Sequence, residues 1–299
     1  MIVGVEILET SVVGAVVDDS GRVKARAATD SGADVVAAVG TTLDRLSSAS
    51  KGSSALGVAA SGVDPSTASR LIDALPSRRT RALRKAVIGS GTAAAVAESW
   101  VGAAAGVDSV VYFGVEPHAM AGVVRDGRPV IGAHGREPAV GWMALNPVER
   151  EDYRKSGCLD AEVAAAGIVR RLIWRIKAGD RSRVQDAVGG DLTAITYDLV
   201  VEAARAKDGV SISVMRDTAK YLGMAAANLV IIADPAMLVL GGIMASASDQ
   251  LLEPIVWELG RRLPGPMMDA LRIRTATLGP DAVVIGAARY AGFVNATES

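Results

Sequence analysis

Cysteine is nearly absent from this chain of 299 residues, which contains only Cys158. A single thiol excludes an internal disulfide and a cysteine-rich zinc site, which favours a reducing compartment. Long apolar runs are also missing, because no stretch approaches the roughly 20 residues that a membrane helix requires. Residues 1–6, MIVGVE, contain an acid and no basic residue, unlike a signal peptide. We therefore expect a cytoplasmic protein with no membrane partner.

An excess of one charge is lacking as well, since 32 Lys and Arg residues stand against 33 Asp and Glu residues. This balance gives no general attraction to nucleic acid, so no nucleic-acid partner is expected. Aromatic residues make up only 4 % of the chain, whereas 50 % of its residues are hydrophobic. The core must then be mainly aliphatic, which is typical of α/β proteins with parallel strands. The length fits two domains of roughly 100–200 residues each.

Short β-branched runs alternate with segments of helical spacing along the whole chain. Strands are expected at residues 2–7, 12–17, 23–27, 55–59, 110–113, 121–124, 129–131, 237–242 and 271–275. Helices are expected at residues 33–49, 93–98, 160–178, 193–232, a segment ending at 262, and 282–293. The first three strands form a β-meander, and a second meander begins near residue 108. The last helix is expected to cross back to the first half of the chain.

The second half contains EAARAKD at residues 202–208, TAKYLG at 218–223, VLGG at 239–242 and LGPDAVVIGAA at 278–288. These segments resemble the ROK family, whose name stands for repressor, open reading frame and kinase. The resemblance implies an α/β, two-lobed actin-like ATPase fold (ribonuclease H-like) with a central cleft. It assigns residues 1–107 plus 281–299 to a small N-terminal lobe and residues 108–280 to a large C-terminal lobe.

Kinases of this family bind the phosphates of ATP with two glycine-rich segments, D-x-G-G-T and G-T-G-x-G, whose backbone donors face the phosphate oxygens. The matching segments here are EILET at residues 6–10 and EPHAM at 116–120. The glycines are replaced, and Glu9 and Glu116 place negative charge where phosphate would lie. Of the first motif only Thr10 remains.

The residues that would act on a sugar also differ from the family pattern. Ser90 occupies the position of the catalytic base, an Asp in N-D-A-N, and a serine hydroxyl has little basicity near neutral pH. We therefore assign no catalytic residue. The sugar-clamping E-x-G-H segment is AVGW at residues 139–142, so Trp142 replaces a histidine. We expect Trp142 to fill the empty pocket, with stacking on a ligand as the alternative. His134, at the entry to this segment, is either a substrate contact or a loop residue without a role.

Gly241 and Gly242 match the glycines against which the family's nucleotide rests. Together with Thr10 they would form a vestigial nucleotide site. A glycine pair at the end of a buried strand is equally expected where a helix packs closely on a sheet. No metal site is expected, because one cysteine cannot provide the four ligands that structural zinc requires.

The sequence predicts a ROK-family sugar kinase-like protein that is catalytically inactive, a pseudokinase acting by ligand binding or protein assembly. The alternative is a divergent, active ATP-dependent sugar kinase of the glucokinase or N-acylhexosamine kinase type, with Glu6, Glu9, Glu98 or Glu116 acting as base or magnesium ligand. No cofactor is expected in the first case, and ATP with magnesium in the second. Family members usually dimerise, so a homodimer is expected, with a small molecule or a protein as a further partner. Because the first predicted strand begins at Ile2, we do not expect the helix-turn-helix of the family's repressors.

Overall fold

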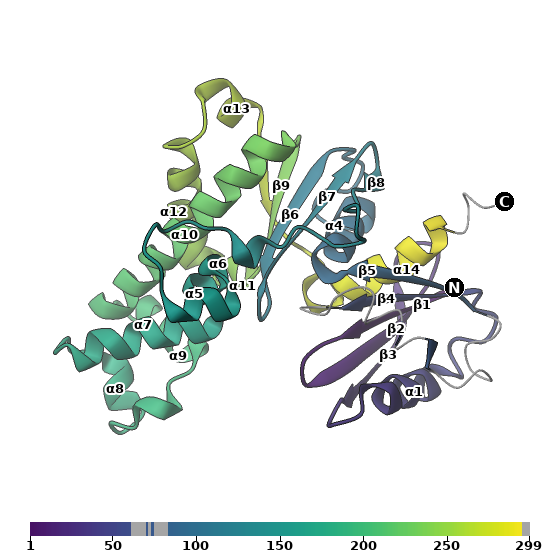
Figure 1. Cartoon of the computed structure of the whole chain (residues 1–299), viewed down its shortest axis with the longest axis horizontal. Helices are drawn as coiled ribbons and strands as arrows, with labels where there is room; N and C mark the ends of the chain where they lie inside the picture. Colours follow the sequence, from purple (N-terminus) through teal and green to yellow (C-terminus); the bar gives the residue numbers. More distant parts are fainter. Residues whose placement is uncertain (61–69, 71–72, 75–82, 295–299) are drawn as a thin grey trace.

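Two five-stranded sheets form the framework of the computed structural model, which describes residues 1–60, 70, 73–74 and 83–294 (Figure 1). The first sheet has the order β3-β2-β1-β4-β5 and the second the order β10-β9-β6-β7-β8. The strands of the first sheet are β1 (Ile2–Ile7), β2 (Ser11–Val17), β3 (Val23–Asp30), β4 (Ala55–Ala60) and β5 (Arg84–Gly89). Those of the second are β6 (Val110–Val115), β7 (Ala119–Arg125), β8 (Arg128–Pro129), β9 (Met237–Gly242) and β10 (Arg272–Thr275). The two-lobed α/β fold is confirmed.

Strand β1 lies at the centre of the first sheet, antiparallel to β2 and parallel to β4. Its β-branched residues favour the strand, and successive side chains point to opposite faces. Val5 and Ile7 pack beneath α1 (Val35–Leu46). Gly4 lies against α14 (Ala282–Val294) on the other face. Glu6 shares the face of Gly4, so the alternation directs its carboxylate toward the second lobe.

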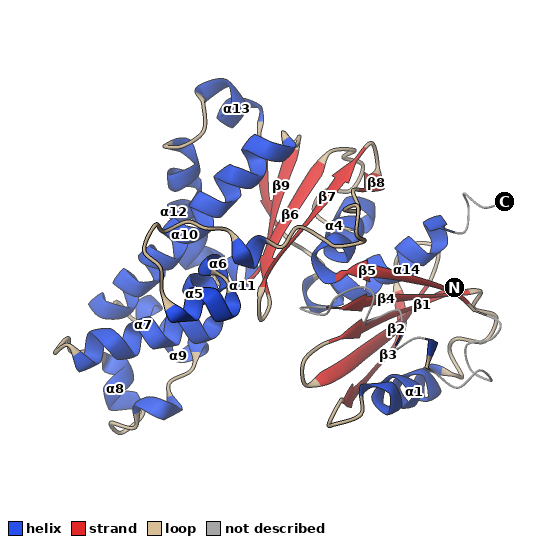
Figure 2. Cartoon of the chain, viewed as in Figure 1, coloured by secondary structure: helices blue, strands red, loops and turns tan. Residues whose placement is uncertain are grey.

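Two helices, α4 (Ser90–Val101) and α14, lie between the sheets (Figure 2). They pack closely because α14 carries Gly286, where a Cβ atom would overlap the carbonyl oxygen of Ala93 in α4. The residues of α14 also contact β1, β4 and β5, so the last described helix belongs to the core of the first sheet. This crossing back is the one that the sequence predicts.

The remaining helices cover the far face of the second sheet (Figure 2). They are α5 (Glu151–Ser156), α6 (Cys158–Val163), α7 (Ala165–Lys177), α8 (Arg183–Ala187), α9 (Tyr197–Arg205), α10 (Gly209–Ala233), α11 (Ile243–Ser246), α12 (Ser248–Gly260) and α13 (Gly265–Ala270). Short 3₁₀ turns occur at η1 (Val140–Trp142), η2 (Leu192–Ala194) and η3 (Gly279–Asp281). Among the helices of the described residues, none has the length and apolar character needed to span a membrane.

Two helical segments that the sequence predicts as continuous are divided. The segment 160–178 is interrupted at Ala164, whose extended backbone separates α6 from α7. The segment 193–232 is interrupted by Asp208, whose side chain accepts a hydrogen bond from the backbone N–H of Ser211 and so begins α10. Side-chain caps of this kind satisfy donors that the first turn leaves free. Helix α10 ends at Ala233 with Asp234 as its C-cap, directly before the proline that the sequence predicts as its stop.

Candidate functional site

The N-terminus of α4 begins at Ser90, the position of the expected base, and a carboxylate from the other lobe lies against it. One oxygen of Glu137 accepts hydrogen bonds from the backbone N–H groups of Gly91, at 2.6 Å, and Thr92, at 3.2 Å. A negative charge is favourable at a helix N-terminus. Burial is the stronger effect, however, and raises the pKa of Glu137 to about 7. The carboxyl group of Glu137, whose pKa is near neutral, therefore lies against Gly91, the residue that follows Ser90.

Glu6 is the second carboxyl group beside Ser90. Its side chain is only 8 % exposed. Burial and the nearby charge of Glu116 raise the pKa of Glu6 to about 7. The Ser90 hydroxyl is close enough to oppose this rise, although no hydrogen bond of good geometry joins the two groups. The Ser90 oxygen is buried and has no hydrogen-bond partner among the described residues.

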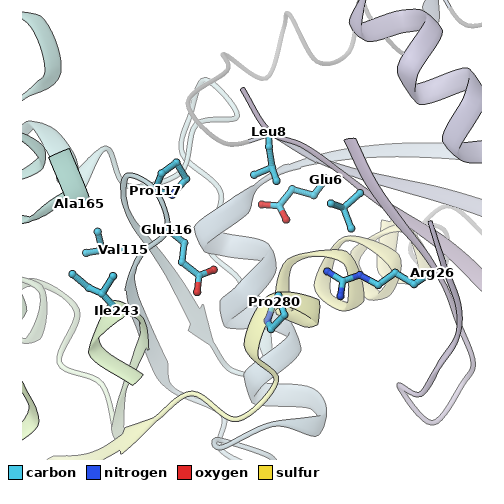
Figure 3. A pocket seen from close by; sticks show the side chains of 10 residues that line it. Glu6, Leu8, Arg26, Val115, Glu116, Pro117, Ala165, Ile243 and Pro280 are labelled. Atoms are coloured by element: carbon cyan, nitrogen blue, oxygen red, sulfur yellow. The ribbon is translucent and has the colours of Figure 1, made fainter. Parts of the chain in front are cut away.

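A cavity of about 360 Å³ opens between the lobes in front of these groups (Figure 3). Glu6 enters it from β1, and Glu116 enters it from the turn that follows β6. Burial also raises the pKa of Glu116. Arg26 is the cationic residue of the lining, and its guanidinium lies 3.3 Å from a carboxylate oxygen of Asp281. The cavity therefore has an acidic interior.

The two segments that replace the glycine-rich motifs contact each other through a histidine. Nε2 of His118 lies 3.0 Å from a carboxylate oxygen of Glu9, and Nδ1 lies 2.6 Å from one of Asp160. The other oxygen of Asp160 accepts the backbone N–H of Ala119 at 2.5 Å. Burial lowers the pKa of His118, but the hydrogen bonds to the two carboxylates outweigh it and raise the pKa above its ordinary value. The resulting Glu9–His118–Asp160 chain links the first lobe to the second.

Gly241 and Gly242 have packing reasons that need no ligand. A Cβ atom at Gly241 would overlap the hydroxyl group of Tyr112 on the neighbouring strand. At Gly242, φ is +58° and a Cβ atom would overlap the carbonyl oxygen of Val115. Other residues adopt this backbone region at a cost, so glycine is favoured there. Close packing in the sheet is thus sufficient to explain both positions.

The remaining residues predicted from sequence lie outside this cavity or on its edge. Trp142 is 59 % exposed, so the prediction that its indole fills an empty pocket is wrong. His134 is exposed in the loop around residues 132–135 and does not line the cavity. Thr10 is exposed in the turn between β1 and β2, next to Glu9. None of these three residues lines the cavity.

Glu98, which the sequence predicts as a candidate base or magnesium ligand, has a structural role in α4. It is fully buried, and its two oxygens accept hydrogen bonds from three backbone N–H groups, those of Ala103, Thr277 and Leu278, at 2.7–3.0 Å. The Thr277 hydroxyl also donates to it at 3.4 Å, so both oxygens are occupied by donors of the protein and are not directed at the cavity. Glu98 therefore joins α4 to the segment that leads into α14.

Comparison with known proteins identifies the family. The ROK family profile matches residues 87–292. The chain belongs to the ROK family. A glucokinase of Halalkalibacterium halodurans is 32 % identical over 196 residues, which are 64 % of this chain and 59 % of that protein. An N-acetylglucosamine repressor of Escherichia coli O6:H1 is 28 % identical over 162 residues, 54 % of this chain and 38 % of the repressor. The matches thus span roughly half the length of these curated ROK relatives.

Solved ROK structures share the fold at lower identity. A glucokinase from Streptomyces griseus, crystallised with glucose and AMPPNP, superposes with a TM-score of 0.79 at 22 % identity and covers 98 % of this chain and 99 % of its own. A ROK hexokinase from Thermus thermophilus has a TM-score of 0.78 at 22 % identity, covering 100 % and 99 %. Both lobes of this chain therefore have the arrangement of the ROK kinases.

ATP with magnesium is the cofactor that ROK kinases imply, and the residues of this cleft do not fit its phosphates. Glu116 and Glu6 are carboxylates in the cavity, and Glu9 is held by His118. Pro117 lacks the backbone donor that a phosphate loop would use. Among residues 1–60, 70, 73–74 and 83–294, no three His, Cys, Asp or Glu side chains are grouped so as to hold a metal ion. We derive no step through ATP.

Glu137 and Asp160 are the site residues that sequence analysis misses. Glu137 meets α4 across 46 positions of the sequence and Asp160 meets His118 across 42, so no local spacing relates the partners. One signal in the sequence points to such a partner. Gly89 precedes α4 and has no side chain to cap it, so the first backbone N–H groups of the helix need another acceptor. That signal calls for an acceptor but does not say which residue supplies it.

Proposed function

We propose that this ROK protein binds a small sugar-like ligand in its cleft and does not transfer a phosphoryl group from ATP. The observation that carries the proposal is the acidic cavity, in which Glu6 and Glu116 approach from different lobes and neither has an ion-pair partner within 4.0 Å among the residues that the structure describes. Phosphate oxygens in this space would be repelled rather than stabilised. Electrostatic stabilisation of phosphate charge is the main contribution that a protein makes to phosphoryl transfer.

The names of the relatives support the sugar part of the proposal. They include a glucokinase, an N-acetylglucosamine repressor and a xylose repressor. Sugars are common to these names, whereas phosphoryl transfer is not. We infer that the cleft keeps the ability to bind a sugar-like molecule while its phosphate side has changed.

The test combines an activity assay with a binding assay. Purified protein is mixed with ATP, magnesium chloride and either glucose or N-acetylglucosamine, and ADP is measured; a ROK glucokinase is the positive control. We expect no sugar-dependent ADP, and no heat when ATP with magnesium is titrated into the protein. Sugar-dependent ADP formation that Glu137→Gln or Glu6→Gln changes would show that the protein is a kinase.

A second candidate, a divergent sugar kinase, is favoured by one observation. The carboxyl group of Glu137 lies beside the position of the family base, and its pKa of about 7 suits a general base at neutral pH. In this case Glu137→Gln would lower the rate by about two to four orders of magnitude, the usual contribution of such a base. The same ADP assay therefore separates the two candidates.

We also propose that the protein forms a homodimer, as the sequence resemblance predicts. Light scattering at two protein concentrations tests this, and a monomeric mass at both would contradict it.

A further inference from the structure

The interlobe cavity contains charged side chains although most of its lining is apolar. Most of its lining residues are apolar, namely Leu8, Val13, Val115, Pro117, Ala165, Ile243 and Pro280. Its charged residues are Glu6, Glu116 and Arg26. Figure 3 shows the carboxylates of Glu6 and Glu116 directed into the same hollow from opposite walls.

The cationic residue of this lining, Arg26, already has an ionic partner. Arg26 lies 3.3 Å from Asp281 across the gap between β3 and η3. Arg26 is the only cationic residue among the described lining residues, and Asp281 offsets its charge, so the two glutamates remain as net negative charge. Glu137 adds to it, because its charge also raises the pKa of Glu6.

Glu6 is the decisive group, because buried charges in folded proteins are normally paired. Its side chain is 8 % exposed, it lines the cavity, and no cationic group of the described residues lies within the 4.0 Å of an ion pair. Next to it, the fully buried Ser90 hydroxyl has no hydrogen-bond partner among the described residues. Glu6 therefore provides an acceptor for a cation in the cavity, whereas Ser90 does not line the cavity.

We propose that this cavity binds an amino sugar, with the protonated amine placed between Glu6 and Glu116. The proposal rests on the ligand binding proposed above and names the class of the ligand. A single bound ammonium group would supply the missing counter-charge to both lobes at once. It would also favour the ionised form of Glu6, whose burial raises its pKa to about 7.

Three related probes isolate the charge. Glucosamine carries a protonated amine, N-acetylglucosamine has the same skeleton with the amine neutralised, and glucose has a hydroxyl group in its place. Calorimetric titration at pH 7.5 should show glucosamine binding at least about tenfold more tightly than either neutral sugar, as one hydrogen bond between charged groups provides.

Variants assign the preference to the two glutamates. Glu6→Gln and Glu116→Gln each keep the side-chain shape and remove one charge, and should weaken glucosamine about 10- to 100-fold while changing glucose little. Glu253→Gln, at an exposed position of α12, is the matched control and should leave all three affinities unchanged. Circular dichroism of each variant verifies that it is folded.

The outcomes distinguish this proposal from the preceding one. Equal binding of glucosamine and glucose, or a preference that survives both glutamate variants, overturns the amino-sugar assignment and leaves sugar binding intact. No binding of any probe by folded protein overturns the assignment as well. Sugar-dependent ADP formation overturns only the absence of phosphoryl transfer, because the affinity ratios are measured without ATP.

Discussion

Three buried glutamates show how differently one residue type is used in this chain. Glu98 holds three backbone N–H groups, Glu137 accepts two at the start of α4, and Glu6 faces a cavity without a cationic partner. The first arrangement stabilises the ionised carboxylate with donors. Glu6 has no comparable set of donors. Burial therefore destabilises its ionised form and raises its pKa.

Glu6→Gln should therefore stabilise the protein at high pH. The folded-state pKa of Glu6 is raised from 4.5 to about 7, so stability present below pH 4.5 is lost as the pH rises through about 7. At pH 8 the variant should gain about 3–4 kcal/mol relative to the wild type, since each pKa unit between 4.5 and about 7 corresponds to about 1.4 kcal/mol. Urea unfolding at pH 4.5 and 8 measures this. An equal difference at the two pH values would contradict the expectation.

Glu98→Ala should have the opposite effect. The substitution leaves the N–H groups of Ala103, Thr277 and Leu278 buried without an acceptor, at about 1–3 kcal/mol for each group that finds no water. We expect a loss of at least about 3 kcal/mol in the free energy of unfolding, measured by urea denaturation. Glu253→Ala on the surface is the control, and a loss no greater than that of the control would show that Glu98 does not hold these segments.

At the scale of elements, close contact between helices sets what can be substituted. Gly286→Ala should force α14 away from α4, because the new Cβ atom would overlap the carbonyl oxygen of Ala93. Overpacking of this kind costs about 1–3 kcal/mol. The matched control is Gly260→Ala at the end of α12, where no atom lies within 4 Å and alanine should be neutral or stabilising by up to about 1 kcal/mol. Thermal unfolding of both variants compares them, and equal melting temperatures would contradict the close contact.

The elements themselves could be predicted wherever a local pattern determines them. β1, β2, β4 and β9 appear within one residue of the predicted ranges, because short apolar runs between turn residues mark both of their ends. The break between α6 and α7 could not be predicted, since it falls in AEVAAAG, a run of good helix formers with no cap or proline before the glycine. Tertiary packing against α10 and η1 determines the path of the chain there.

The candidate site was less predictable than the fold. The replaced motif residues Glu6, Glu116 and Ser90 could be located from the sequence, because their segments align with the motifs of the ROK family, although strand β5 before Ser90 was not predicted. Whether two such carboxylates meet depends on how the lobes close, which no local pattern records. The same reason explains why Trp142 was predicted inside a pocket although it lies on the surface.

At the scale of the whole molecule, the Glu9–His118–Asp160 chain is a polar connection between the lobes across the mouth of the cleft. A protonated His118 donates to both carboxylates, whereas a neutral imidazole can donate to only one. Because the folded-state pKa of His118 is raised from 6.5, its contribution is complete below pH 6.5 and is lost as the pH rises through the folded value.

The unfolding free energy of the wild type should therefore exceed that of His118→Gln by more at pH 6 than at pH 8.5. Urea denaturation at both values measures the difference. The imidazole resonance that disappears in His118→Gln should titrate above pH 6.5 in the wild-type NMR spectrum. A resonance that titrates below pH 6.5, or a stability difference independent of pH, would show that Glu9 and Asp160 do not stabilise the protonated form of His118.

The return of α14 to the first sheet also has a consequence for synthesis on the ribosome. β1 to β5 are made early, yet Gly4 and Gly57, in β1 and β4, pack against the backbone of α14, which is made after the whole second sheet. Residues between β6 and β10 form a contiguous unit that can fold as soon as it emerges. The first sheet, although translated earlier, must wait with one face uncovered until the final helix arrives, so it is the part of the nascent chain most in need of a chaperone.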